Sequence, residues 1–207
     1  MKRIIKDYNN SKIITENLSY NCKKGANNST LGKLLLKEHK SFCAYSEEFI
    51  IPISDSNDIE HFNPDLKGSD DDSYSNWFKV KNKVNLRKRL KEKEFKKKNI
   101  SFLDILHPCE NDFEEKLKYI VGEYRFKESF DIKVTNLIDF LELNMPEKIE
   151  QRRDFIVRKR KEISAFGVSA EDFFKTLIED DISEIKYLRT IQEEFNIDIW
   201  NMIPELK

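Results

Sequence analysis

The stretch that decides the fold spans residues 59–98 and contains three segments of different character. IEHF (59–62) and YSNWFKV (74–80) are short and rich in apolar and aromatic residues. VNLRKRLKEKEFKKK (84–98) is strongly basic and has a helical pattern. The polar, acidic loop from Asn63 to Ser73 separates the first two segments. This order predicts two extended segments followed by a helix, that is, a ββα unit.

Working outward, the pattern predicts secondary structure on both sides of this unit. The pattern predicts a short strand and a loop within residues 3–20. It predicts a helix over 27–40 and another strand over 43–53. A β-like stretch ends near Phe126, and four helices are predicted from Asp131 onward. The fold class is therefore α+β, a small ββα unit followed by a mainly helical region. The predicted parts are an N-terminal lead-in (1–42), the ββα unit (43–99) and the helical region (100–207).

Composition limits the class of protein. The chain has 207 residues, of which 39% are hydrophobic, enough for a packed core in one domain or a small domain with a helical extension. Charged residues make up 36%, yet the formal net charge is only -1, so affinity for nucleic acid would have to come from local charge segregation. Such segregation exists, because Lys79 to Lys98 contains eleven Lys or Arg and only two acids. A solvated helix face would give the same pattern.

Cysteine usage and hydropathy predict the location. Cys22, Cys43 and Cys109 stand at unrelated spacings, which predicts neither a disulfide framework nor a CxxC metal site. No stretch is apolar enough to span a bilayer, and the N-terminus has no signal-peptide pattern. The sequence thus predicts a cytoplasmic protein that does not contact the membrane.

The Glu60-His61 doublet has the residue types that phosphodiester hydrolysis needs. A histidine can deprotonate water near neutral pH, because its usual pKa is about 6.5. A hard divalent cation prefers oxygen ligands, which Glu60 could supply together with Asn85 at the start of the basic helix. Asn76 could fix the loop that carries His61. Each residue alone is weak evidence, since a lone histidine is more often structural or exposed.

The combination resembles the HNH (ββα-metal) nuclease superfamily. That family has an acid or histidine before the catalytic histidine, then -x-x-P, then an asparagine, and finally Asn or His on a helix, often as N-x-x-K. The corresponding residues here are Glu60-His61 with Pro64, Asn76, and Asn85 with Lys88. The segments TLGKLLLKEHKSFCAYSEEFI, ILHPCENDFEEKLKYIVGEY and LIDFLELNMPEKIEQRR resemble a bacterial HNH subfamily associated with Septu-type and retron defence systems. The similarity covers roughly residues 28–160.

The resemblance implies an endonuclease that cleaves nucleic acid with Mg²⁺ or Mn²⁺. It implies that His61 is the general base, that Glu60 and Asn85 are metal ligands, and that Asn76 orients the histidine loop. It also implies an anti-phage effector subunit with an ATPase partner. The helical region then offers a surface for that partner or for self-association. The residues expected to contact phosphate are Arg87, Lys88, Arg89 and Lys91.

One departure from the family concerns zinc. Many members hold a structural zinc ion with two C-x-x-C pairs. Here Cys43 is present, but Ser46, Lys81 and Val84 stand at the other three positions. One thiolate cannot form a tetrahedral zinc site, so the sequence predicts no structural zinc. A second departure is Glu60 itself, where aspartate or histidine is commoner.

Two alternatives remain open at the level of sequence. The unit could be a catalytically inactive module for nucleic-acid binding or assembly. It could also be an RNase, for instance one that cleaves transfer RNA, because the same groups contact phosphate in DNA and RNA. DNA is favoured since most HNH enzymes cut it.

Overall fold

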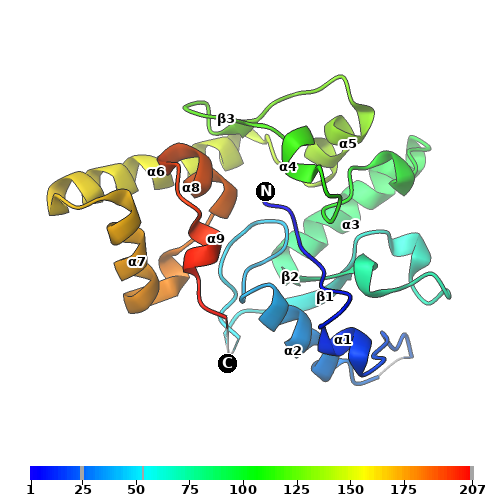
Figure 1. Ribbon diagram of the computed structural model, residues 1–207. Helices are drawn as coiled ribbons and strands as arrows, with labels where there is room; N and C mark the ends of the chain where they lie inside the picture. Colours follow the sequence, from blue (N-terminus) through cyan, green and yellow to red (C-terminus); the bar gives the residue numbers. More distant parts are fainter. Residues whose placement is uncertain (24–25, 53, 206–207) are drawn as a thin grey trace.

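The computed structural model describes residues 1–23, 26–52 and 54–205 (Figure 1). The strands are β1 (Asn57–His61), β2 (Trp77–Lys81), β3 (Tyr119–Ile120) and β4 (Arg125–Phe126). The α-helices are α1 (Lys12–Thr15), α2 (Ser29–Glu38), α3 (Asn82–Lys97), α4 (Phe113–Lys116), α5 (Ile132–Phe140), α6 (Pro146–Phe166), α7 (Ala170–Asp181), α8 (Leu188–Phe195) and α9 (Ile199–Met202). Short 3-10 turns are η1 (Pro64–Leu66), η2 (Tyr74–Asn76), η3 (Phe102–Asp104) and η4 (Ile182–Glu184).

Strands β1 and β2 pair antiparallel and are followed directly by α3. In their register Asn57 lies opposite Lys81, and His61 lies opposite Trp77. Helix α3 contacts both strands. The predicted order of two strands and a helix is therefore confirmed, as is the mixed α+β fold class. The helix begins at Asn82, two residues before the predicted start, because the chain leaves β2 without a connecting turn.

Burial explains why this segment of sequence forms these elements. Phe78 and Val80 in β2 are fully buried, as expected for β-branched and aromatic residues in a packed strand. In α3 the buried residues are Asn85, Lys88 and Phe95, whereas most of the remaining Lys and Arg side chains of this helix are exposed. The inner face of α3 is thus partly polar, and the buried side chains of Asn85 and Lys88 need hydrogen-bond or ion-pair partners.

Two of the predicted strands are wrong. Within 3–20 the structure has no strand and instead contains the single turn of α1, which Ser11 caps by accepting a hydrogen bond from the Ile13 amide. The described part of 43–53 forms a turn with isolated bridges, one of them between Phe42 and Phe49, and residue 53 lies outside the described residues. The apolar side chains of this turn enter the core directly, which satisfies the hydrophobic pattern without a strand.

The helical end of the chain follows its sequence signals. Gly167 ends α6 in the left-handed conformation (φ 66°), where glycine has no steric penalty. Ser169 caps α7 by accepting a hydrogen bond from the Asp172 amide. Helices α6 to α8 lie together on one side of the molecule, away from α1 and the β1–β2 pair (Figure 1). Helix α9 lies between them and the end of α2, where the Lys40 ammonium donates to the Trp200 carbonyl (2.9 Å).

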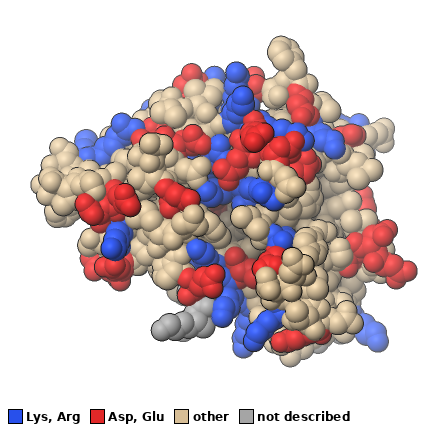
Figure 2. All heavy atoms as spheres, viewed as in Figure 1, with Lys and Arg blue, Asp and Glu red and all other residues tan. Residues whose placement is uncertain are grey.

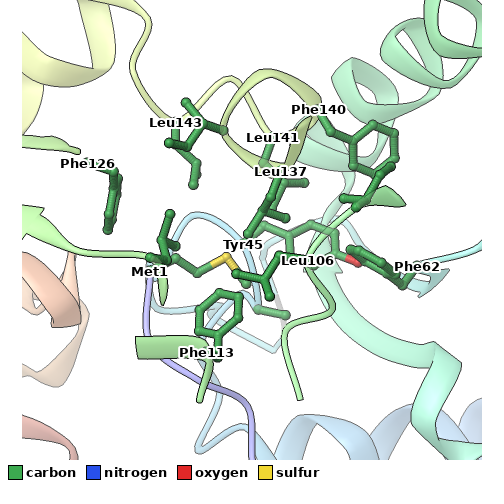
Figure 3. Packing of buried hydrophobic residues seen from close by; sticks show 14 of the residues in the cluster. Met1, Tyr45, Phe62, Leu106, Phe113, Phe126, Leu137, Phe140, Leu141 and Leu143 are labelled. Carbon is green, nitrogen blue, oxygen red and sulfur yellow. The ribbon is translucent and has the colours of Figure 1, made fainter. Parts of the chain in front are cut away.

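Two large apolar clusters form the core. The first joins side chains of the ββα unit to those of the segment 100–143, and Figure 3 shows Tyr45, Phe62, Leu106 and Phe140 within it. The second is built mainly from residues of α6 to α9. Because the first cluster contains residues from both sides of position 99, the segment that follows α3 packs against the ββα unit and stabilises it.

No helix of the described chain is long and apolar enough to cross a membrane.

Candidate active site

His61 is the last residue of β1, and its side chain is enclosed by the loop that follows. The residue is only 6% exposed. Its Nε2 atom lies 3.1 Å from Oδ2 of Asp72. Nε2 has no aligned hydrogen-bond partner among the described residues, so the attraction is electrostatic and greatest when the ring is protonated. The ring of Tyr20 packs edge-on against the imidazole, with 4.5 Å between ring centroids.

Asp72 is held in place by a network of donors. Its Oδ1 accepts hydrogen bonds from the indole Nε1 of Trp77 (2.7 Å) and from Nδ2 of Asn76 (3.1 Å). Its Oδ2 accepts a hydrogen bond from the Gly68 amide (3.1 Å). The carboxylate is thus oriented before any ligand binds. Sequence reasoning missed this residue, because SDDDS (69–73) showed only an acidic loop with three equivalent aspartates.

Asn76 links that network to the loop after His61. Its Oδ1 accepts a hydrogen bond from the Asn63 amide (2.7 Å), and its Nδ2 donates one to the Asn63 carbonyl (3.0 Å). Its own carbonyl accepts one from the Phe62 amide (2.9 Å). These bonds fix the two residues that follow His61, which is the contact that a loop-orienting asparagine requires.

Burial sets the protonation state of His61. Desolvation lowers the pKa of the imidazole, and the neighbouring Asp72 carboxylate opposes that shift. The ring is therefore neutral at pH 7, as a general base must be before it accepts a proton. Because the pKa is lower in the folded protein than in the unfolded chain, this group's contribution to stability is lost as the pH falls below the usual histidine range.

Replacing Asp72 with asparagine is expected to lower the pKa of His61 further, because the carboxylate that favours the imidazolium loses its charge. A ¹H–¹⁵N NMR titration of the imidazole measures this shift. Asp71→Asn changes the same loop by the same charge at an exposed position and should leave the titration of His61 unchanged. An equal response to both substitutions would contradict a specific pairing with Asp72.

Glu60 is buried in an ion cluster with Lys88. Its Oε1 lies 2.5 Å from the Lys88 ammonium, and its Oε2 accepts a hydrogen bond from the Tyr45 hydroxyl. Lys88 also lies 2.6 Å from Oε1 of Glu92 and donates to the His61 carbonyl (3.0 Å). Burial raises the pKa of Glu60, and the Lys88 ammonium and the Tyr45 hydroxyl oppose the rise.

Asn85 faces a different carboxylate. Its Nδ2 donates to Oδ2 of Asp58 (2.8 Å), which also accepts a hydrogen bond from Asn82 (2.9 Å). The structure therefore does not bring Glu60 and Asn85 together as a ligand pair. Within the described residues, no group of three or more His, Cys, Asp or Glu side chains is placed to hold a metal ion.

This arrangement does not fit the divalent metal that the resemblance implies. Both oxygens of Glu60 are already bonded, one of them to a cation. The amide group of Asn85 is engaged through its nitrogen with Asp58. A metal at Glu60 would have to displace the ammonium of Lys88.

The four basic residues expected to contact phosphate have different surroundings. Lys88 is buried in the cluster described above, and Lys91 is paired with Asp139 (2.7 Å) and with Glu94 (3.2 Å). Arg87 is exposed and lies 3.9 Å from Oε2 of Glu142. Arg89 is exposed and forms no ion pair with a described residue.

Arg89 belongs to a basic stripe that sequence reasoning did not single out. Lys93 and Lys97 follow it at intervals of four residues on the same face of α3, and both are exposed. Lys96, beside the stripe, lies 2.5 Å from Oδ1 of Asp65 in the loop after His61. The stripe therefore borders the loop that carries the histidine. On the face shown in Figure 2, basic and acidic side chains are interspersed, and no broad surface of one sign is visible there.

In the family that the sequence resembles, zinc is held at the positions that correspond here to Cys43, Ser46, Lys81 and Val84. The Cys43 sulfur accepts a hydrogen bond from the Lys81 amide (3.4 Å), and Ser46 and Val84 line one small cavity of about 210 Å³. Lys81 itself points its ammonium at Glu48 (3.3 Å) and Asp55 (3.2 Å). Ion pairs and apolar contacts therefore stabilise this part of the ββα unit.

Comparison with family models, curated proteins and solved structures gives no match for this chain.

Proposed function

We propose that this protein is a nucleic-acid phosphodiester hydrolase, an endonuclease of the HNH type, in which His61 is the general base. One observation carries the proposal: an enclosed imidazole at the end of β1 lies against the oriented carboxylate of Asp72, on a ββα scaffold. A paired imidazole and carboxylate is the arrangement that removes a proton from water and stabilises the resulting imidazolium.

In the proposed reaction, a water molecule attacks the phosphorus atom and loses its proton to His61. One phosphorus–oxygen ester bond breaks in the same step, and the leaving sugar oxygen takes a proton from solvent. Asp72 lies beside Nε2, so Nδ1 is the nitrogen left to accept that proton. The positive charge that develops on the ring is then stabilised by Asp72 at 3.1 Å. The ring of Tyr20 packs edge-on against the imidazole, so a phosphodiester that approaches from that side requires Tyr20 to move.

The basic stripe is the proposed contact for the phosphate backbone. Arg89, Lys93 and Lys97 are exposed, have no ion-pair partner among the described residues and border the histidine loop. DNA is the proposed substrate, and RNA is the second possibility that the same experiment tests. Duplex DNA, single-stranded DNA and total RNA, incubated side by side with wild-type protein and with His61→Ala, rank the substrates and identify the base.

Substituting Arg89, Lys93 and Lys97 together with glutamine is expected to weaken nucleic-acid binding at every sequence. The dependence of log K on log salt should also flatten by about 0.9 for each duplex phosphate contact that is lost. Fluorescence anisotropy over a range of salt concentrations measures both effects. The triple substitution of Lys12, Lys161 and Lys175 makes the same charge change at exposed positions elsewhere. Equal weakening by both triple variants would refute a specific stripe.

A second candidate is a non-catalytic module for nucleic-acid binding or assembly. The observation that favours it is the engagement of Glu60 by Lys88 and Tyr45. This candidate predicts that the wild type binds nucleic acid and that His61→Ala changes neither binding nor the integrity of the substrate. Cleavage by the wild type together with no cleavage by His61→Ala would exclude this candidate.

The role in anti-phage defence and the ATPase partner are proposals that rest on the resemblance alone. The helices α6 to α9 supply a separate surface for that partner or for a second copy of this chain (Figure 1). Size-exclusion chromatography with light scattering, with and without a candidate ATPase, tests the assembly directly.

A further inference from the structure

The cluster around Lys88 is a fully enclosed ammonium group surrounded by oxygen atoms. Lys88 is 2% exposed, and its Nζ lies 2.5 Å from Glu60, 2.6 Å from Glu92 and 3.0 Å from the His61 carbonyl. We propose that this ammonium is the resident cation of the ββα unit and that it excludes a divalent metal ion from Glu60 and Glu92.

The surroundings of Lys88 hold the ammonium in place. The Phe140 ring of α5 lies below it, with 4.9 Å from Nζ to the ring centroid, so aromatic packing and cation–π attraction support it from that side. The Tyr45 hydroxyl donates to the second oxygen of Glu60. Burial and the adjacent carboxylate raise the pKa of Tyr45, which therefore remains a donor. Both oxygens of Glu60 are thus bonded without a metal.

The same geometry explains the exclusion. Mg²⁺ and Mn²⁺ bind carboxylate and carbonyl oxygens, with Mg²⁺ at about 2.0–2.1 Å from its ligands. Those oxygens here converge on the ammonium of Lys88. A divalent ion at this point would meet a buried positive charge, and moving Lys88 aside would separate that charge from the carboxylates that pair with it.

Removing the ammonium should convert the cluster into a metal site. In Lys88→Ala, the carboxylates of Glu60 and Glu92 and the carbonyl of His61 lose their shared cation. The buried charge of Glu60 and the partly buried charge of Glu92 then remain close together. A hard divalent cation is the ligand that such an oxygen set selects. Binding there would relieve the repulsion between the carboxylates and stabilise the fold by mass action.

Mn²⁺ binding to the full chain tests this proposal, measured by the loss of the free-ion EPR signal and by isothermal titration calorimetry. The wild type is expected to bind no Mn²⁺ at Glu60, whereas Lys88→Ala gains a single site, and the melting temperature of that variant rises with Mn²⁺. Adding Glu60→Gln to Lys88→Ala should abolish the gained site. Lys96→Ala, which removes a lysine from an exposed ion pair of the same helix, should gain none.

Mn²⁺ binding to the wild type that Glu60→Gln removes would overturn the proposal, and so would failure of folded Lys88→Ala to bind Mn²⁺. If alanine prevents folding, Lys88→Met keeps a side chain against Phe140 and takes its place. An NMR measurement on the wild type complements the variants. The ¹⁵N signal of the Lys88 ammonium should be unchanged by millimolar Mg²⁺, and its loss would also overturn the proposal. These experiments report metal binding, so their outcome is separate from whether the chain hydrolyses nucleic acid.

Discussion

Replacing Lys88 with alanine, in the absence of metal, is expected to lower the free energy of unfolding by about 3–5 kcal/mol, the usual cost of removing one partner from a buried ion pair. The reason is that Glu60 and Glu92 then share an enclosure without a cation. Truncation also removes the side chain that packs against Phe140. Urea unfolding followed by circular dichroism, in a buffer with chelator, measures the change.

A matched substitution separates the ion cluster from the helix itself. Lys93→Ala changes an exposed lysine of α3 and should alter the free energy of unfolding by less than about 0.5 kcal/mol. The double variant Lys88→Met/Glu60→Gln removes both charges of the closest pair and should recover a large part of the lost stability. A small loss in Lys88→Ala, comparable to that of Lys93→Ala, would contradict the account of the cluster.

Replacing His61 with alanine is expected to reduce the rate of phosphodiester cleavage by about 10²–10⁴-fold, the usual contribution of a positioned general base. Binding should change little, because the phosphate contacts proposed here lie on the exposed stripe of α3 and not on the imidazole. The variant thus separates catalysis from binding. Measuring cleavage rate and dissociation constant on the same preparation checks both expectations.

The stability of His61→Ala needs its own control, since the ring is enclosed and contacts Tyr20. His61→Gln keeps a polar side chain at the same position and should be equally slow, because an amide cannot accept the proton. Cleavage at the wild-type rate by folded His61→Gln would show that the base is another group.

The sequence predicted the elements whose pattern is local. Strand β1, strand β2 and α3 follow from two short apolar segments and a helical basic run, and the end of α6 follows from Gly167. The predicted strand at 43–53 failed, because apolar residues in a turn and in a strand give the same pattern when both are buried. The packing of this turn against β2, through the Cys43–Lys81 and Ala44–Lys79 hydrogen bonds, decides between them.

The site was harder to predict, because its contacts come from distant parts of the chain. Lys88 is one of many lysines in α3, and nothing local distinguishes it from Lys91 or Lys93. Its burial depends on Phe140, which α5 brings against the inner face of α3. Likewise, the choice of Asp72 among three adjacent aspartates depends on how the loop folds back toward Trp77 and Asn76.

In the proposed function, His61 is the general base for phosphodiester hydrolysis, and Asp72 supports it on the ββα unit. The most direct test measures the nicking rate of supercoiled plasmid by wild type, His61→Ala and Asp72→Asn, with added Mg²⁺ or Mn²⁺ and with chelator. We expect nicking by the wild type, no nicking by His61→Ala, and a slower rate for Asp72→Asn, whose melting temperature should show that it is folded. Nicking that survives unchanged in folded His61→Ala, or wild-type protein that nicks under none of these conditions, would contradict the account.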